Sequence, residues 1–194
     1  PSSLHRKGLE AQHEMEYARN QLAGALGCKP QEIVFTSGAT ESTNLALCGA
    51  AAAYGRKRKK IITSAVEHAS VKETMAHLET LGFQIVQVCP DGNGIYHAED
   101  FLREADKDTC LISIMLVNNE NGYRMPVEDV FRILKRRDPE IITHCDAVQG
   151  FLKIPFKTRT LCADLVSVSG HKVHALKGAG ALYVRHGVRL KPVL

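Results

Sequence analysis

Apolar and polar positions along the chain alternate between segments that favour strands and segments that favour helices. The first helix is predicted over residues 4–26, which contain few helix breakers and end at Gly27. Short apolar runs bounded by turn residues predict strands over residues 32–38, 59–66, 83–90, 109–117, 141–146, 164–170 and 180–185. Longer segments without breakers predict helices over residues 39–55, 69–82, 97–105 and 126–137.

This repeated order of strand, helix and strand predicts an α/β fold. We expect a mainly parallel, or mixed, sheet with helices on both faces. No repeat and no low-complexity linker interrupts the chain, so residues 1–194 are expected to form one domain.

Composition narrows the class of protein. The chain has 194 residues, of which 44% are apolar, which is enough for one core. The net charge of +4 permits an anionic ligand but does not indicate nucleic acid, and the basic run 56–60 is expected to be a solvated loop. None of the six cysteines forms a C-x-x-C pair, and no signal peptide or long apolar run is present. We therefore expect a cytoplasmic protein without membrane contact, in which Cys48, Cys110, Cys145 and Cys162 are buried.

Polar residues collect where the predicted strands end. The segments that follow strands are TSGATES, VEH, NNE, HCDAVQ and SVSGHK. In open parallel sheets, ligands bind beyond the carboxyl ends of the strands. We therefore expect these segments to meet at one site.

The turn at Gly38, Ala39 and Thr40 opens a helix. Free backbone N–H groups at a helix start, together with the helix dipole, favour an anion. The alternative is an ordinary N-cap by Thr40 or Ser42.

A lysine follows Ser-Gly-His at another strand end. A partly desolvated Lys172 near cationic groups is a good nucleophile toward an aldehyde, and Ser169 and His171 could donate hydrogen bonds to a phosphate. The alternative is a surface lysine.

Asp146 directly follows a buried strand, where an acid is costly unless it is paired. A protonated pyridine nitrogen is a suitable partner, and Gln149 would reach the phenolic oxygen of the same ring. Alternatively, Asp146 caps the short AVQG turn. The spacing of His144, Cys145, Asp146, His171 and His174 does not match a metal site, so no metal is predicted.

Together, the strings FTSGATEST, VEHASV, SIMLVNNENG, THCDAVQ and SVSGHKVHALKGAGALYVR closely resemble the class V aminotransferase family of fold-type I pyridoxal-phosphate (PLP) enzymes. The resemblance is closest to the cysteine desulfurase and selenocysteine lyase branch. It covers nearly the whole chain, in the order of the family, and implies the cofactor-binding large domain of that fold.

The resemblance implies a role for each matching residue. Lys172 would form the internal aldimine with pyridoxal 5'-phosphate, and His68 would stack on the ring and move protons. Asp146 would pair with the pyridine nitrogen and Gln149 with the ring oxygen. Asn119 would lie beside the ring and substrate. The phosphate would be held by Ala39, Thr40, Ser169 and His171.

The resemblance also implies an activity: removal of sulfur, or selenium, from cysteine or selenocysteine to give alanine, by a homodimer that passes sulfur to an acceptor protein. Family chains are about twice as long. Their C-terminal small domain, with the acceptor cysteine and the arginine that binds the substrate carboxylate, has no match here, so we expect this chain to be inactive alone.

The chain also departs from the family pattern at Asn121 and in residues 173–178. The alternatives are another class V enzyme, such as an aminotransferase or amino-acid lyase, and a non-catalytic PLP-binding module.

Overall fold

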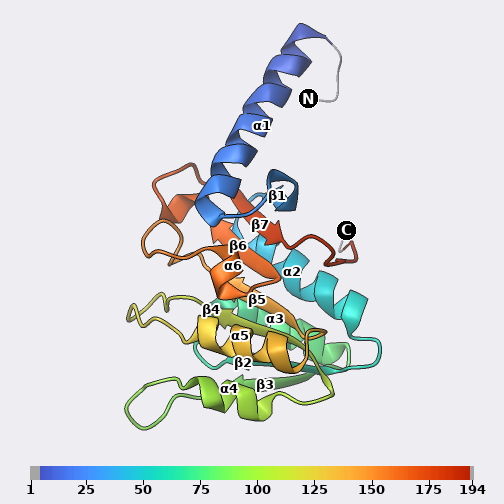
Figure 1. Ribbon diagram of the computed structural model, residues 1–194, viewed down its shortest axis with the longest axis vertical. Helices are drawn as coiled ribbons and strands as arrows, with labels where there is room; N and C mark the ends of the chain where they lie inside the picture. The colour runs from blue at the N-terminus through green and yellow to red at the C-terminus, as the bar shows by residue number, and fades with distance from the viewer. Residues whose placement is uncertain (1–4, 193–194) are drawn as a thin grey trace.

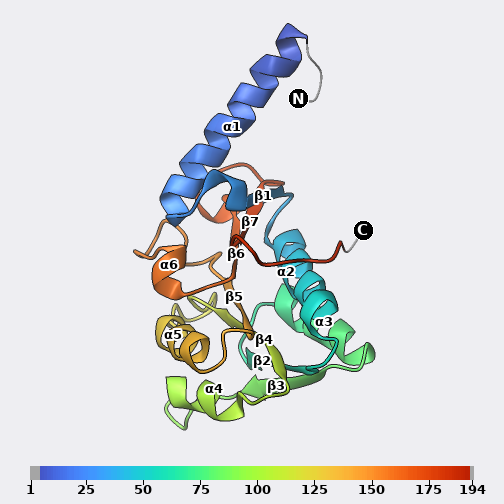
Figure 2. The same ribbon diagram turned by 45° about the vertical axis from the view of Figure 1, so that its right-hand side comes forward.

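The computed structural model describes residues 5–192, which form a seven-stranded sheet with helices on both faces (Figures 1 and 2). Its strands lie in the order β1-β7-β6-β5-β4-β2-β3. Their bounds are β1 Ile33–Thr36, β2 Lys60–Ser64, β3 Gln84–Val88, β4 Thr109–Met115, β5 Ile142–Asp146, β6 Leu165–Ser169 and β7 Gly180–Val184. The predicted α/β fold with a mixed sheet is therefore confirmed.

Only β7 runs against the other described strands. It pairs antiparallel with both β1 and β6, whereas β6, β5, β4, β2 and β3 pair in parallel. Strand β1 therefore points the same way as the parallel group. As a consequence, the carboxyl ends of β1, β2, β4, β5 and β6 lie along one edge of the sheet.

The helices divide between the two faces (Figure 2). Helices α2 (Ala39–Tyr54) and α3 (Ala69–Thr80) pack on the face that carries Ile61, Leu111 and Leu165. The opposite face, with Ile112 and Val166, is covered by α4 (Ala98–Glu104), α5 (Val127–Arg137), α6 (Thr158–Leu161) and the end of α1 (Arg6–Leu26). Adjacent strand residues thus enter different cores, as the pleat of a strand requires.

Helix α1 projects away from the sheet (Figure 1). Of its residues, only Gly8, Ala23 and Leu26 are buried, and Leu9, Met15 and Tyr17 are exposed. Gly27, in the left-handed conformation, ends the helix, as the sequence predicts. Leu4, the first residue of the predicted helix, lies outside the described part of the chain.

Two expectations about surface and burial need comment. Cys110 and Cys145 are buried, but Cys48 and Cys162 are only half-buried, so the prediction is wrong for the latter two. Arg56 and Lys57 of the basic run are exposed, whereas Arg58 and Lys60 form ion pairs. No helix of the described residues is long and apolar enough to span a membrane.

Candidate active site

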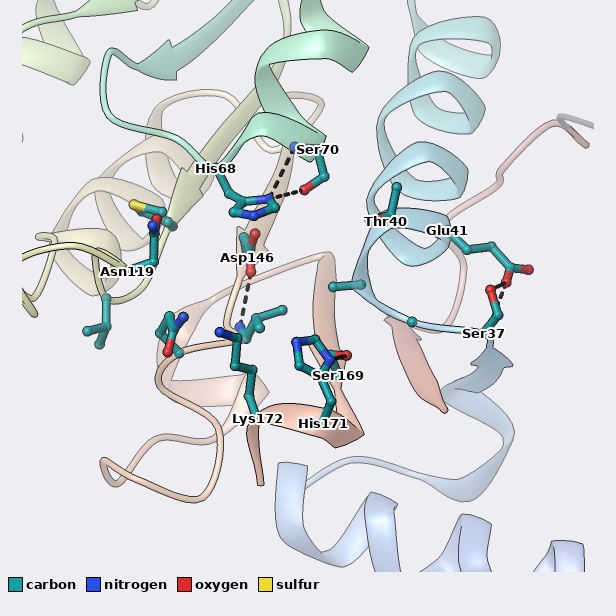
Figure 3. Close-up of a pocket in the computed structure, with 16 residues that line it drawn as sticks. Ser37, Thr40, Glu41, His68, Ser70, Asn119, Asp146, Ser169, His171 and Lys172 are labelled. Atoms are coloured by element: carbon teal, nitrogen blue, oxygen red, sulfur yellow. Dashed lines mark hydrogen bonds between the residues drawn. The ribbon is translucent and has the colours of Figure 1, made fainter. Parts of the chain in front are cut away.

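A cavity of about 420 Å³ opens at the carboxyl edge of the sheet (Figure 3). The loops after β1, β2, β4, β5 and β6 all contribute to its wall. The fold therefore brings together every residue that the sequence nominated, which are Ala39, Thr40, His68, Asn119, Asp146, Gln149, Ser169, His171 and Lys172.

The first wall of the cavity is the start of α2. The helix begins at Ala39 with Gly38 as its N-cap, and no side chain caps it. The prediction that Thr40 or Ser42 is the N-cap is therefore wrong. Instead, the Glu41 carboxylate accepts hydrogen bonds from the Ser37 N–H, at 2.7 Å, and from the Ser37 hydroxyl, at 2.6 Å. This leaves the first-turn N–H groups of α2 without a side-chain acceptor, which suits an anion.

A glycine on β7 allows α2 to begin close to the sheet. A Cβ added to Gly180 would lie 2.6 Å from the Cα of Gly38. Any side chain at position 180 would therefore displace the turn that opens α2. The close approach places the helix start beside Ser169, at the end of β6.

His68 has a fixed orientation because it is the N-cap of α3. Its Nδ1 accepts the Ser70 N–H at 3.1 Å and lies 2.9 Å from the Ser70 hydroxyl oxygen. In the neutral ring the proton therefore resides on Nε2. Figure 3 shows the ring at the cavity wall, above Asp146.

Asp146 is only 5% exposed at the end of β5. Its Oδ1 accepts the Val148 N–H at 3.0 Å, the dashed contact below Asp146 in Figure 3, so the carboxylate does cap the following turn. No ion pair reaches Asp146 from elsewhere in residues 5–192. Burial raises the pKa of Asp146, although the Val148 N–H and the nearby His68 oppose this rise. The site thus holds a buried acid that a cationic ligand would stabilise.

Lys172 ends the short helical turn Gly170–Lys172 that follows β6. Its side chain extends into the cavity (Figure 3), and it has no hydrogen bond or ion pair within the described structure. It is exposed, so the predicted partial desolvation is wrong for this chain. Beside it, Ser169 Oγ lies 2.8 Å from His171 Nδ1. The amine is therefore open to an incoming aldehyde.

Glu67, which immediately precedes His68 in the sequence, was not nominated as a site residue. Its Oε1 accepts hydrogen bonds from the Ser64 hydroxyl and, at 2.9 Å, from the Met115 N–H, so it joins the ends of β2 and β4. Its Oε2 is buried and has no partner in the described part of the chain. Burial raises the pKa of Glu67 to about 8. An acid between Val66 and His68 at a strand end was the available signal, the same one that singled out Asp146.

The family model for class V aminotransferases matches residues 1–194, so the chain belongs to this family. A relative in Dictyoglomus turgidum (strain DSM 6724 / Z-1310), a cysteine desulfurase IscS, is 45% identical over all of this chain and 49% of its own length. Another IscS, from Escherichia coli O9:H4 (strain HS), is 45% identical over 98% of this chain and 46% of its own.

Among solved structures, a NifS-like protein superposes with a TM-score of 0.95 at 44% identity, over 100% of this chain and 53% of that one. The structure titled "SspA in complex with cysteine" superposes with a TM-score of 0.94 at 38% identity, over 100% of this chain and 56% of that one. This chain thus spans about half the length of the curated relatives it matches.

Class V aminotransferases and cysteine desulfurases depend on PLP, and the cavity suits that group. The uncapped start of α2 suits a phosphate. Asp146, buried without a cationic partner, suits a protonated ring nitrogen, and the free amine of Lys172 suits an aldehyde.

Proposed function

We propose that this chain is the cofactor-binding large domain of a PLP-dependent cysteine desulfurase. The main support is that one cavity combines an exposed lysine and a buried aspartate, neither of which has an ion-pair partner within residues 5–192, with a helix start that no side chain caps. The relatives are named cysteine desulfurases, which supports removal of sulfur from cysteine, and the family resemblance implies alanine as the product.

In this proposal each nominated residue acts on the cofactor or substrate. Lys172 Nζ would attach the cofactor, and Asp146 would pair with its ring nitrogen. Gln149 would bond the ring oxygen, although its Oε1 now accepts from Lys153 Nζ at 3.2 Å and would have to turn. Asn119 would lie beside the ring. The phosphate would be held by Ala39, Thr40, Ser169 and His171.

When bound, PLP supplies an electron sink for the charge left after deprotonation at the substrate Cα. His68 moves protons through Nε2, because its Nδ1 is engaged with Ser70. An acceptor thiolate would attack the substrate sulfur to form a persulfide. The Cβ–S bond would break with its electron pair left on carbon, and protonation at Cβ and Cα would give alanine. None of the six cysteines, all within the described residues, lines the cavity. We therefore place the acceptor cysteine and the small domain outside this chain.

We also propose that the whole protein is a homodimer and delivers sulfur to an acceptor protein. The support for a further packing partner is an apolar depression of about 540 Å³ beside α1, lined in part by Leu22, Phe35 and Leu152.

All six cysteines are free, which is consistent with the reducing cytoplasm that we propose as the location of the protein.

The test compares this chain with the full-length polypeptide that contains it. Each is given L-cysteine, PLP and dithiothreitol, which reduces a persulfide and releases its outer sulfur as sulfide, and alanine, sulfide and keto acid are measured. We expect alanine and sulfide from the full-length protein and no turnover from residues 1–194 alone. A keto acid in place of alanine would indicate the alternative, an aminotransferase or another amino-acid lyase. Turnover by the chain alone would overturn the proposal that essential residues lie outside it.

A parallel assay with L-selenocysteine decides the natural cargo. A higher kcat/KM for selenocysteine would assign the protein to selenium chemistry rather than sulfur. If the full-length protein binds PLP but converts neither amino acid, the result would favour the alternative that it is a non-catalytic PLP-binding module.

A further inference from the structure

A row of buried polar side chains crosses the sheet on the face that α2 and α3 cover. Thr63 of β2 pairs in register with Ser113 of β4, and Ser113 pairs with His144 of β5. Ser167 of β6 is in register with Asp146 rather than with His144, so it lies two residues nearer the carboxyl end on the same face, and its hydroxyl reaches back to His144. All four residues are at most 2% exposed. The proposed reaction uses none of them.

Hydrogen bonds join three members of this row into a line. His144 Nδ1 lies 2.8 Å from the Ser113 hydroxyl oxygen, and His144 Nε2 lies 2.9 Å from that of Ser167. Burial lowers the pKa of His144 to about 3, so the ring is neutral at pH 7. A neutral imidazole has one donor and one acceptor nitrogen, and a hydroxyl can fill either role. One ring therefore satisfies both serines and links β4, β5 and β6 through side chains.

The line lies directly beneath the floor of the cavity. Ser113, His144 and Ser167 each precede a cavity-lining residue by two positions: Met115, Asp146 and Ser169. Residues two apart on a strand share a face and are separated by about 6.6 Å. On each strand the hydrogen-bonded side chain thus lies two residues before one that lines the cavity, and Ser167 is in register with the cavity-lining Asp146.

Stability alone does not account for this line. The residues two positions earlier on the same face of these strands are apolar: Leu111, Ile142 and Leu165, the last of which is in register with His144. Apolar side chains of similar shape could fill the hydrogen-bonded row at little cost, because a buried hydrogen bond gives only about 1 kcal/mol net. Apolar side chains would, however, form no side-chain hydrogen bonds between neighbouring strands, and these bonds have a fixed direction.

We propose that His144 is a positioning residue whose two hydrogen bonds fix the spacing and rotation of β4, β5 and β6. Asp146 and Ser169 then present their oxygens to the cavity from fixed places. The inference rests on the proposed function only in that the cavity binds PLP; the arrangement of the strand ends can be measured without the cofactor.

The main variant combines S113A, H144F and S167A, which removes the line while leaving no hydroxyl unpaired. We expect PLP to bind this variant at least about tenfold more weakly, with an altered pH profile of the absorbance of bound PLP. His144→Gln, whose amide also offers one donor and one acceptor, should stay within about threefold of wild type. The shorter His144→Asn should not.

Thr63→Val is the matched control. Thr63 belongs to the same row, but its hydroxyl has no hydrogen-bond partner among the described residues. Its replacement should leave affinity and the pH profile unchanged. Equal losses of PLP affinity in Thr63→Val and in the triple variant would show a general packing effect and overturn the proposal. Unchanged PLP affinity in both the triple variant and His144→Asn would also overturn it.

Hydrogen exchange of the chain without PLP separates this inference from the proposed function. The amides of residues 146–149 and 169–172 should exchange faster in the triple variant and in His144→Asn, while those of Gln84–Val88 in β3 should not change. A uniform change across the sheet, or none, would overturn the inference. If wild type fails to bind PLP, the proposed function fails, and the exchange pattern still decides the role of His144.

Discussion

Buried acidic side chains have cationic partners at the amino ends of the parallel strands but not at their carboxyl ends, among the described residues. At the amino end, Asp164 is fully buried and forms ion pairs with Lys135 and with Arg185, the latter at 2.6 Å. Arg58 joins Asp138 and Glu140 at the same edge, through contacts of 2.5 and 2.8 Å. At the carboxyl end, Asp146 and Glu67 are buried but have no cationic partner in the described chain.

This difference separates the ion pairs at the amino end, which hold the fold, from Asp146, which lines the cavity and would be stabilised by a cationic ligand. A buried charge is tolerated when its partner is part of the same chain, and removal of one partner is then costly. A buried acid without a partner raises its own pKa and is stabilised when a cationic group arrives. The following variants test this division.

The largest effect is expected at the amino end. Asp164→Asn leaves the half-buried Lys135 without its ion-pair partner and should lower the free energy of unfolding by about 3–5 kcal/mol. Urea denaturation measures this loss. Binding of PLP by the folded fraction should not change. A loss below about 1 kcal/mol would show that the amino-end pairs do not hold the fold.

Asp146→Asn should have the opposite effect: PLP affinity should fall while stability is retained. Without the carboxylate, the ring nitrogen loses its partner, and PLP affinity should fall about 10–100-fold, or about 1.4–2.7 kcal/mol. The cofactor-free chain should be no less stable, because burial already disfavours the charged form of Asp146. Absorbance titration with PLP and urea denaturation give the two quantities. A loss of stability comparable to that of Asp164→Asn would show that Asp146 also stabilises the fold and would contradict the difference between the two ends.

Glu67→Gln should change how stability depends on pH. Burial raises the pKa of Glu67 from its ordinary 4.5 to about 8, so between these values the native protein keeps a proton that the unfolded chain loses. Stability must therefore fall as pH rises through this window, by at most about 1.4 kcal/mol per pH unit.

The glutamine variant removes this contribution. From pH 6 to pH 7, wild type should lose about 1.4 kcal/mol relative to Glu67→Gln, as measured by urea denaturation at each pH. Parallel pH curves for the two proteins would show that Glu67 is already ionised at pH 6.

The smallest effects are expected for the basic run. Arg58→Met breaks two partly exposed ion pairs and should cost about 1 kcal/mol. Arg56→Met, at an exposed position, should change stability by less than about 0.5 kcal/mol. Thermal melting of both variants checks the difference, and equal losses would mean that the pairs of Arg58 contribute nothing.

The sequence predicted the elements better than their arrangement. Every strand of the sheet overlaps a predicted segment, because short apolar runs between turn residues are a local signal. The reversed β7 between β1 and β6 was not predicted, since strand order is set by packing between distant segments. Helix α6 (Thr158–Leu161) was missed because it is only one turn long.

The same limit applies to the site. Strand-end polarity pointed to five segments, and the family resemblance then identified within them the nine residues that line one cavity. Neither could show the uncapped start of α2, which depends on Glu41 turning back to Ser37. The bonds of His144 to Ser113 and Ser167 were equally hidden, because each crosses between strands that are distant in the sequence.

The most direct test of the central claim is covalent attachment of PLP to Lys172. The chain is incubated with PLP, reduced with borohydride, digested and analysed by mass spectrometry, with Lys172→Ala as the control. We predict a single major label on Lys172 in wild type and its loss in the variant. A label spread over surface lysines, or an equal total label in Lys172→Ala, would contradict the assignment of this cavity as the cofactor site.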